Sequence, residues 1–211
     1  MNYKKSIWAI CILASTSPIT YLKAADNIDQ LREASVVLIR AGQVEQGLDQ
    51  LRTLLTQQPQ NQKLIADYIV SAQAHQKLKV TDLGYLQSIN VQSFPEYAWL
   101  SVVKGQRDLK QFVAAAKWAD IFYQQSQQQQ WLVWQGVLNA EAGQTAVAKQ
   151  KLAQIKKDQL SPDYLAQMSY AYRVLNMPVE ALEIAQDALS KQALNIDIQE
   201  QYVLALMVNS D

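Results

Sequence analysis

Residues 42–61 read GQVEQGLDQLRTLLTQQPQN, and this stretch decides the fold. Gly42 can form a turn, the small residue Gly47 follows five positions later, and leucines then recur at helical spacing until Pro59. Apolar residues three and four apart lie on one face of an α-helix, which proline cannot continue. The stretch therefore predicts the turn and second helix of an antiparallel helical hairpin, with the small residue where the two helices cross.

The same pattern returns along the chain. With Pro59 as position 32 of a unit, units begin near residues 28, 62, 96, 129 and 162, at intervals of 34 or 33 residues. Small residues occupy the crossing position in four units: Gly47, Ala115, Ala148 and Ala181. The second unit has Thr81 there. This arrangement resembles the tetratricopeptide repeat, a two-helix unit of 34 residues that buries its apolar face only by stacking on its neighbours.

The resemblance predicts an all-α, right-handed solenoid of about five helical hairpins plus a final helix, over a domain spanning residues 25–211. We call the two helices of each repeat helix A and helix B. The expected helices are 29–41, 44–57, 62–75, 79–90, 96–104, 108–125, 130–142, 145–157, 162–175, 178–191 and the terminal helix 196–208. The terminal helix contains several apolar residues, such as Met207. We therefore expect that a longer parent chain or a partner covers it. The glutamine-rich stretch 124–130 is expected to be a polar loop or a frayed helix end.

Residues 1–24 have the features of a cleavable signal peptide. Lys4 and Lys5 precede an apolar stretch of about eight residues, far shorter than the ~20 needed to span a bilayer. Cleavage is expected between Ala24 and Ala25. It would remove three lysines and the only cysteine, leaving 16 basic and 19 acidic residues. We therefore expect a periplasmic protein without disulfides.

Composition excludes several classes of function. The full chain has 19 basic and 19 acidic residues, whereas nucleic-acid-binding proteins carry a basic excess. One histidine and one cysteine are too few for most metal sites and for histidine-based catalysis. Phosphate-binding glycine loops and the common hydrolase motifs are absent from the sequence. We therefore expect no catalytic residues, no metal, no cofactor and no enzymatic activity.

Binding is the remaining class, and the concave surface formed by the A helices is where the repeat offers it. Positions 2, 5, 9, 12 and 13 of helix A line this groove in tetratricopeptide proteins. The candidate binding residues on this chain are Asp29, Arg32, Tyr97, Lys104, Arg107, Asp108, Glu141, Asp163, Tyr170 and Arg173. Tyr97 and Tyr170 are the strongest candidates, because an exposed aromatic ring can stack on a sugar or anchor a peptide. The alternative is that these residues form ordinary solvated helix faces. Trp99, Trp118, Trp131 and Trp134 fit packing between helices at least as well as a ligand site.

Four segments carry a closer resemblance: 61–77 (NQKLIADYIVSAQAHQK), 94–103 (FPEYAWLSVV), 139–155 and 165–182. They are similar to the periplasmic amino-terminal region of the poly-β-1,6-N-acetylglucosamine export porins of biofilm-forming bacteria, here without the β-barrel that follows in that family. The resemblance implies a docking module near the outer membrane that binds the partly deacetylated, cationic polymer, its periplasmic deacetylase, or both. The acids among the candidate residues suit a cationic ligand. The alternative function is a general envelope scaffold that binds peptide segments of partner proteins.

Overall fold

The computed structural model describes residues 18–210, which form helices and connecting turns with no strand among them. The α-helices are α1 (Pro18–Arg40), α2 (Val44–Gln57), α3 (Gln62–Ala74), α4 (Trp99–Asp108), α5 (Phe112–Ser126), α6 (Gln129–Glu141), α7 (Thr145–Ala153), α8 (Pro162–Val174), α9 (Pro178–Lys191) and α10 (Ile196–Ser210). Short 3-10 helices are η1 (Val80–Ser88), η2 (Glu96–Ala98) and η3 (Lys157–Gln159). Among these helices, none is both long and apolar enough to cross a membrane.

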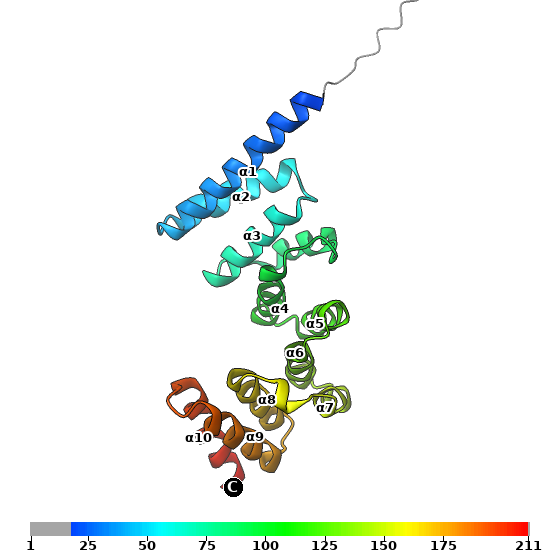
Figure 1. Cartoon of the computed structure of the whole chain (residues 1–211), viewed down its shortest axis with the longest axis vertical. Coiled ribbons are helices and arrows are strands. Elements are labelled where there is room, and N and C mark those ends of the chain that lie inside the picture. The colour runs from blue at the N-terminus through cyan, green and yellow to red at the C-terminus, as the bar shows by residue number, and fades with distance from the viewer. Residues whose placement is uncertain (1–17, 211) are drawn as a thin grey trace, which may run out of the picture.

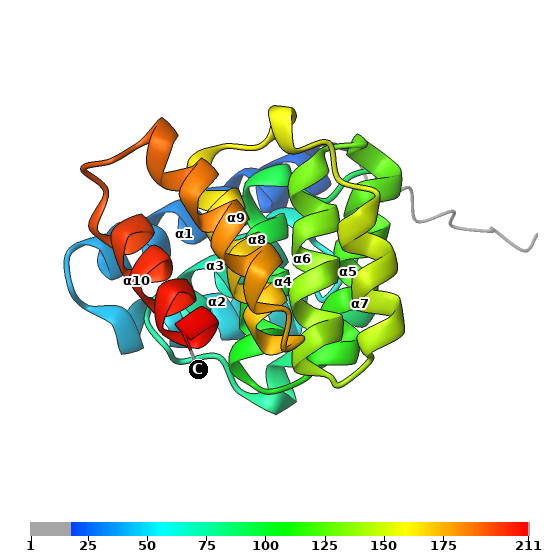
Figure 2. The same ribbon diagram turned by 90° about the horizontal axis from the view of Figure 1, so that it is seen from below.

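Antiparallel helix pairs stack along the long axis of the molecule (Figure 1). The pairs are α1 with α2, α4 with α5, α6 with α7 and α8 with α9, and α10 packs on both helices of the last pair. In Figure 1, α1 is seen along its length while α4 to α7 are seen nearly end-on, so the pairs turn progressively along the stack. The view along that axis shows the same turning (Figure 2). The predicted all-α solenoid is confirmed.

Five turns connect helix A to helix B, and each contains one residue in the left-handed conformation. These residues are Gly42, Gln76, Lys110, Gly143 and Asn176, with φ between +54° and +86°. In every turn, the N–H of the following residue donates to a carbonyl five positions back, for example Gln43 N to Leu38 O at 2.9 Å. This bond pattern closes the C-terminus of a helix. The intervals between the turns are 34, 34, 33 and 33 residues, the same as the intervals between the predicted repeats.

Small residues lie where the helices of a pair cross, as predicted. Ala115, Ala148 and Ala181 are completely buried, and Gly47 is buried at the crossing of α1 and α2. A methyl group on Gly47 would lie 2.6 Å from the Ser35 carbonyl oxygen and 2.5 Å from Ile39 Cγ1. A second close approach occurs at Gly136, where a methyl group would lie 2.4 Å from Leu152 Cδ2. The pairs therefore have no room for larger side chains at these positions.

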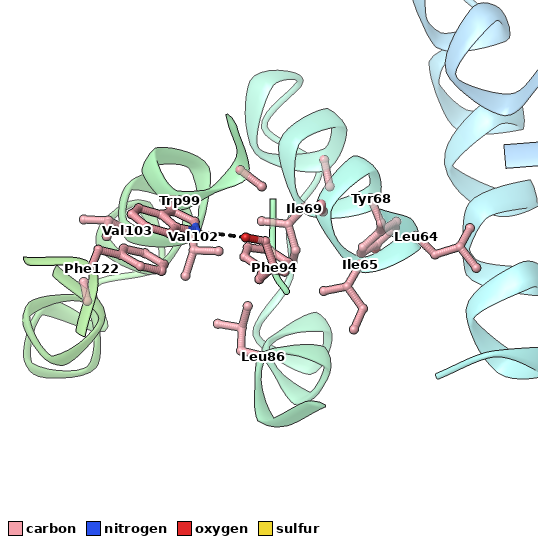
Figure 3. Packing of buried hydrophobic residues seen from close by; sticks show 14 of the residues in the cluster. Leu64, Ile65, Tyr68, Ile69, Leu86, Phe94, Trp99, Val102, Val103 and Phe122 are labelled. Atoms are coloured by element: carbon pink, nitrogen blue, oxygen red, sulfur yellow. Dashed lines mark hydrogen bonds between the residues drawn. The ribbon is translucent and has the colours of Figure 1, made fainter. Parts of the chain in front are cut away.

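The interior contains an aromatic centre between the third and fourth repeats. Trp99 and Phe122 stack with ring centroids 4.6 Å apart, and Trp131 packs against both. The Trp99 indole N–H donates to the Phe94 carbonyl oxygen at 3.3 Å, as the dashed line in Figure 3 shows. The predicted packing role of Trp99 and Trp131 is confirmed, and Trp118 also packs on this centre while half-buried.

The second repeat departs from the prediction. An α-helix predicted at 79–90 is wrong: the segment forms the 3-10 helix η1, followed by non-helical residues up to Pro95. Its crossing position holds Thr81, which is exposed, so the close contact that fixes helix B elsewhere is missing. The Asp82 carboxylate also accepts the Lys79 backbone N–H at 2.8 Å, a local bond that competes with helix formation.

Other predicted helix boundaries also need correction. The first helix, predicted at 29–41, begins earlier, because α1 starts at Pro18. The predicted helix 96–104 begins as the 3-10 turn η2, and its α-helical part extends to Asp108. The predicted helix 108–125 begins only at Phe112, because the left-handed Lys110 forms the turn between α4 and α5. The predicted helix 145–157 ends as an α-helix at Ala153.

The two ends of the chain differ in how far the structure tests their predictions. The final helix α10 buries Ile198 and Ala205, while Val203 and Met207 remain exposed. Residues 1–17 of the predicted signal peptide lie outside the described residues, and α1 begins at Pro18. Cleavage after Ala24 stays a prediction.

The crossing of α1 and α2 gives a stability prediction. Gly47→Ala should lower the free energy of unfolding by at least about 1 kcal/mol, because overpacking against a backbone carbonyl outweighs the gain in helix propensity. Gly84→Ala is the matched control, since a methyl group there meets no atom within 4 Å. Urea unfolding followed by circular dichroism measures both variants. Equal unfolding midpoints would contradict the close crossing.

The turns give a prediction of opposite sign. Gln76 has a positive φ, and Gln76→Gly should raise the free energy of unfolding by about 0.5–1 kcal/mol. The reason is that an L-residue in the left-handed region costs about 1–2 kcal/mol, while glycine loses about 0.4–1 kcal/mol more chain entropy. Gln186→Gly, in the middle of α9, should lower it by about 0.5–1 kcal/mol. Thermal and urea unfolding measure both variants, and a change of the same sign in both would exclude the proposed turn geometry.

Candidate binding groove

Side-chain bonds connect the A helices of successive repeats in one row. Arg32 of α1 donates to Asp67 of α3. Gln73 of α3 donates to Asp108 of α4 at 3.1 Å, and Arg107 of α4 to Glu141 of α6 at 2.6 Å. Arg173 of α8 donates to Gln201 of α10. We call these four bonds the groove ladder. Eight of the ten candidate residues belong to these bonds or contact one of their members, so the ladder marks the predicted concave surface.

The largest concentration of candidate residues surrounds a cleft near the C-terminal end of the row. This C-terminal cleft has a volume of about 470 Å³, within the usual range of ligand sites. It is lined by side chains of α4, α6, α8 and α10: Leu100, Lys104, Arg107, Trp134, Val137, Asp163, Tyr164, Ala166, Gln167, Tyr170, Asp197, Ile198 and Gln201. Four of the predicted residues, Lys104, Arg107, Asp163 and Tyr170, therefore share one cavity.

Arg107, Glu141 and Tyr170 form a closed network at this cleft. The guanidinium of Arg107 binds Glu141 through two nitrogens, with Nε–Oε2 at 2.8 Å and Nη2–Oε1 at 2.6 Å. The Tyr170 hydroxyl donates to the same Oε1 at 2.8 Å. Hydrogen bonding to Glu141 raises the pKa of Arg107, and burial together with Glu141 raises the pKa of Tyr170. The Glu141 carboxylate, one of the acids expected to suit a cationic ligand, is therefore already bound by Arg107 and Tyr170.

Arg173 differs from Arg107 in its partner. Its guanidinium donates to the Gln201 amide oxygen and lies 5.6 Å from the centre of the Tyr170 ring. Its Nε is buried with no hydrogen-bond partner in the described chain. Burial lowers the pKa of Arg173, whereas acidic neighbours raise the pKa of Arg32 and Arg107 against the effect of burial. Arg173 is therefore a half-buried cation paired only with a neutral amide.

Two further polar atoms at the cleft lack a hydrogen bond. The Gln167 Oε1 and the indole Nε1 of Trp134 are both buried without a partner within residues 18–210. The pKa of Tyr164 is raised mainly by burial, and the nearby Trp134 indole N–H opposes this increase. Buried polar groups are nearly always satisfied in folded proteins, so the unsatisfied atoms of Gln167 and Trp134, which both line this cleft, favour a ligand site there.

The other candidate residues lie farther along the row, and the structure does not bring them to the C-terminal cleft. Arg32 forms ion pairs with Asp29 and Asp67, and the Tyr97 hydroxyl donates to Asp67 at 2.5 Å. Burial and the Asp67 carboxylate raise the pKa of Tyr97. The Tyr97 ring remains 58% exposed, but it stands on η2 and not on a helix A. Asp108 lines a separate pocket between α3 and α4 together with Lys104.

Sequence reasoning missed several residues of the groove. Asp67, Trp134 and Gln167 all occupy position 6 of their repeats, which is not one of the five positions assigned to the groove. Position 6 lies four residues after position 2 and three before position 9, so helical geometry places it on the same face. Gln201 and Asp197 come from α10, to which the repeat pattern assigns no groove position.

Trp134 belongs both to the interior and to the lining of the cleft. The residue is 3% exposed, and the centre of its ring lies 5.8 Å from the Arg107 guanidinium. A guanidinium at this distance over an aromatic face is attracted to the ring electrons. The indole therefore joins the interior to the wall of the cleft.

Chemical groups for catalysis by a metal are not assembled in the described part of the chain. Residues 18–210 hold no group of three or more histidine, cysteine, aspartate or glutamate side chains placed to bind a metal ion. The carboxylates at the C-terminal cleft are Asp163, which accepts from the Asn195 amide at 3.3 Å, and Asp197. The arrangement can form hydrogen bonds, ion pairs and aromatic contacts, which are the interactions of a binding site.

Comparison with known proteins identifies the fold. No protein-family model matches the chain, and no curated protein matches it. Its structure is similar to that of a thermophilic tetratricopeptide-repeat protein of Thermus thermophilus, with a TM-score of 0.57 and 15% identity over 85% of this chain and 99% of that one. It is also similar to a tetratricopeptide-repeat protein of Parabacteroides merdae, with a TM-score of 0.51 and 14% identity over 89% and 76% of the two chains.

A third similar structure belongs to the Cut9–Hcn1 hetero-tetramer of the APC/C, with a TM-score of 0.55 and 13% identity. The match covers 92% of this chain and 40% of that one. At such low identity the likeness concerns the fold, and it agrees with the left-handed turns at 34- and 33-residue intervals. The chain is an all-α solenoid of tetratricopeptide-repeat type.

Proposed function

We propose that this protein is a non-enzymatic binding scaffold that holds an extended segment of a partner protein in its concave groove. The observation that carries the proposal is the C-terminal cleft, whose walls come from four successive helices of the row. Stacked repeats form an extended surface, which is the geometry that solenoids offer to partners. A short peptide bound there would contact side chains from several repeats at once.

The chemistry of the cleft supports a polypeptide partner. Tyr164, Tyr170 and Trp134 line it and supply aromatic contact area of the kind that anchors a peptide with little loss of side-chain entropy. Gln167 and Gln201 are amides, which can both donate to and accept from a peptide backbone. The Oε1 of Gln167 has no partner in the described chain, so a backbone N–H of a bound segment would satisfy it.

A second candidate ligand is partly deacetylated poly-β-1,6-N-acetylglucosamine, as the sequence resemblance implies, with the periplasmic deacetylase of that polymer as the protein partner. The observation favouring it is that Asp163 and Asp197 lie at the same cleft as Tyr164 and Tyr170. A free amine of the polymer is cationic and would pair with a carboxylate, while a sugar ring can stack on a tyrosine. In this version the protein is a docking module for polysaccharide export, associated with the outer membrane.

Blocking the cleft tests the scaffold proposal. Lys104 is exposed and lines the cleft, so Lys104→Trp should obstruct it without overpacking the interior and should lower partner binding at least about tenfold, a loss of ~1.4 kcal/mol. Lys117→Trp, on an exposed position of helix B α5, makes the same chemical change outside the groove and should bind like the original chain. Binding is measured on arrays of overlapping peptides from envelope proteins and confirmed in solution by fluorescence anisotropy.

Fully acetylated and partly deacetylated glucosamine oligomers form the second arm of the same experiment. Binding of deacetylated oligomers that Lys104→Trp abolishes, with no peptide bound, would assign the groove to the polymer. The proposed role of the groove would be overturned by either of two results. One is that Lys104→Trp changes neither peptide nor oligomer binding, and the other is that the unmodified protein binds neither.

The place of action is a separate proposal that rests on the predicted signal peptide. We expect the chain, tagged at its C-terminus and produced in a Gram-negative host, to appear in the periplasmic fraction with Ala25 as its first residue. Replacing Lys4 and Lys5 by glutamate should retain it in the cytoplasm, because export signals need a positive amino-terminal region. Mass spectrometry of the fractions identifies the first residue of the chain in each. A chain that still begins at Met1 and lies in the cytoplasm would refute the proposal.

A further inference from the structure

The groove ladder changes its chemistry at the last bond. The first three bonds each end on a carboxylate, contributed by Asp67, Asp108 and Glu141. The fourth joins Arg173 to the neutral amide of Gln201. Arginine donors occur in three of the four bonds, and Arg173 is the one whose bonded partner on the next helix carries no charge.

In the described chain, the surroundings of Arg173 supply no carboxylate that bonds to it. Its Nε is buried and unbonded, and none of the ion pairs within residues 18–210 includes it. The carboxylate that contacts its neighbour Tyr170, Glu141, is also bound by Arg107. Asp163 accepts from Asn195, and Glu200 acts on Arg173 through its charge without a hydrogen bond. Burying a cation without an anionic partner costs free energy, so an incoming carboxylate would be stabilised here.

Arg52 is a partly buried arginine outside the ladder with which Arg173 can be compared. It lies on helix B α2, away from the ladder, and it binds the Asp49 carboxylate and the Tyr68 hydroxyl. The pKa of Arg52, like those of Arg32 and Arg107, is raised because hydrogen bonds to its neighbours outweigh burial. Burial instead lowers the pKa of Arg173. The difference follows from the missing carboxylate, since all four guanidinium groups are partly buried.

We propose that the Arg173 guanidinium, which contacts Gln201 and Tyr170 of the cleft lining, binds the carboxylate of an acidic side chain in the partner segment. This inference rests on the proposed function, because it specifies the chemistry of the peptide that the groove holds. Lys104, exposed in the same cleft, adds positive charge to the approach. The carboxylate supplies the negative charge that Asp67 and Glu141 supply in the earlier bonds of the ladder and that Gln201 does not.

The test uses three pools of eight-residue peptides with blocked ends, identical except for a central glutamate, glutamine or lysine. The glutamate pool should bind at least about tenfold more tightly than the glutamine pool, because a hydrogen bond to a charged group contributes more than one to a neutral group. Nuclear magnetic resonance of the Arg173 Nε–Hε pair reports whether the carboxylate reaches this guanidinium. Inorganic phosphate and the glucosamine oligomers are titrated alongside the pools.

Two variants separate recognition from folding. Arg173→Gln should remove the preference for the glutamate pool. Gln201→Glu supplies an internal carboxylate to Arg173 with almost unchanged shape, so it should lower binding of the glutamate pool at least about tenfold while the unfolding temperature stays equal or rises. Lys149→Gln, on the exposed surface of α7, removes one positive charge elsewhere and is the control.

The outcomes distinguish the carboxylate site at Arg173 from the more general proposal that the groove binds a partner. Equal binding of the glutamate and glutamine pools, or a preference for lysine or for deacetylated oligomers, would overturn the carboxylate site while leaving the groove as a binding surface. A preference that persists in Gln201→Glu would also overturn it. If no pool binds, the carboxylate site is refuted. The Lys104→Trp experiment then tests the proposed scaffold function independently of that site. Phosphate binding that matches the glutamate pool would show a general anion site in place of a peptide subsite.

Discussion

The rest of the structure depends on the close approach of the two helices in each hairpin. At that crossing the chain places a buried glycine or alanine, and at Gly47 even a methyl group would collide with the backbone of α1. The second repeat shows what happens without this contact. Thr81 stands at its crossing position, and the segment after α3 forms a 3-10 helix in place of a full helix B. Side-chain size at one position per repeat therefore governs whether the outer helix forms, while the A helices continue the row regardless.

The turns convert this local contact into a continuous surface. A left-handed residue at 34- or 33-residue intervals ends each helix A at the same position of its repeat. Side chains at nearly equivalent positions of successive A helices then come within bonding distance. The first three bonds of the ladder therefore join residues 34 or 35 positions apart, such as Arg107 with Glu141, whereas the last joins residues 28 positions apart. Partly exposed ion pairs contribute little stability individually. The ladder instead indicates where side chains of successive repeats lie close enough to contact the same ligand.

Much of this architecture can be predicted from the sequence, because it depends on residue size and periodicity. The predicted bounds of α2 and α9 are the observed ones, and the repeat phase agrees with the left-handed turns. The state of the groove cannot be predicted in the same way. Glu141 looks like an available acid in the sequence, but Arg107, 34 residues earlier, occupies both of its oxygens. Tyr97, expected on a helix A, lies on a 3-10 turn. Such pairings depend on side-chain positions across repeats, which a linear pattern does not contain.

The two ends of the groove differ in how completely their polar groups are satisfied, and this difference bears on where a partner gains specificity. Near the N-terminal end, Arg32, Asp67 and Tyr97 bind one another, so a ligand would have to break these contacts before forming its own. At the C-terminal cleft, Gln167 Oε1 and Arg173 Nε are buried without partners in the described chain. No hydrogen bond of these groups has to break when a ligand binds. A ligand that cannot bond to them leaves them buried and unsatisfied, so it binds less tightly. Recognition should therefore be concentrated between α4 and α10, with the earlier repeats supplying the rigid frame that holds this part of the row in register.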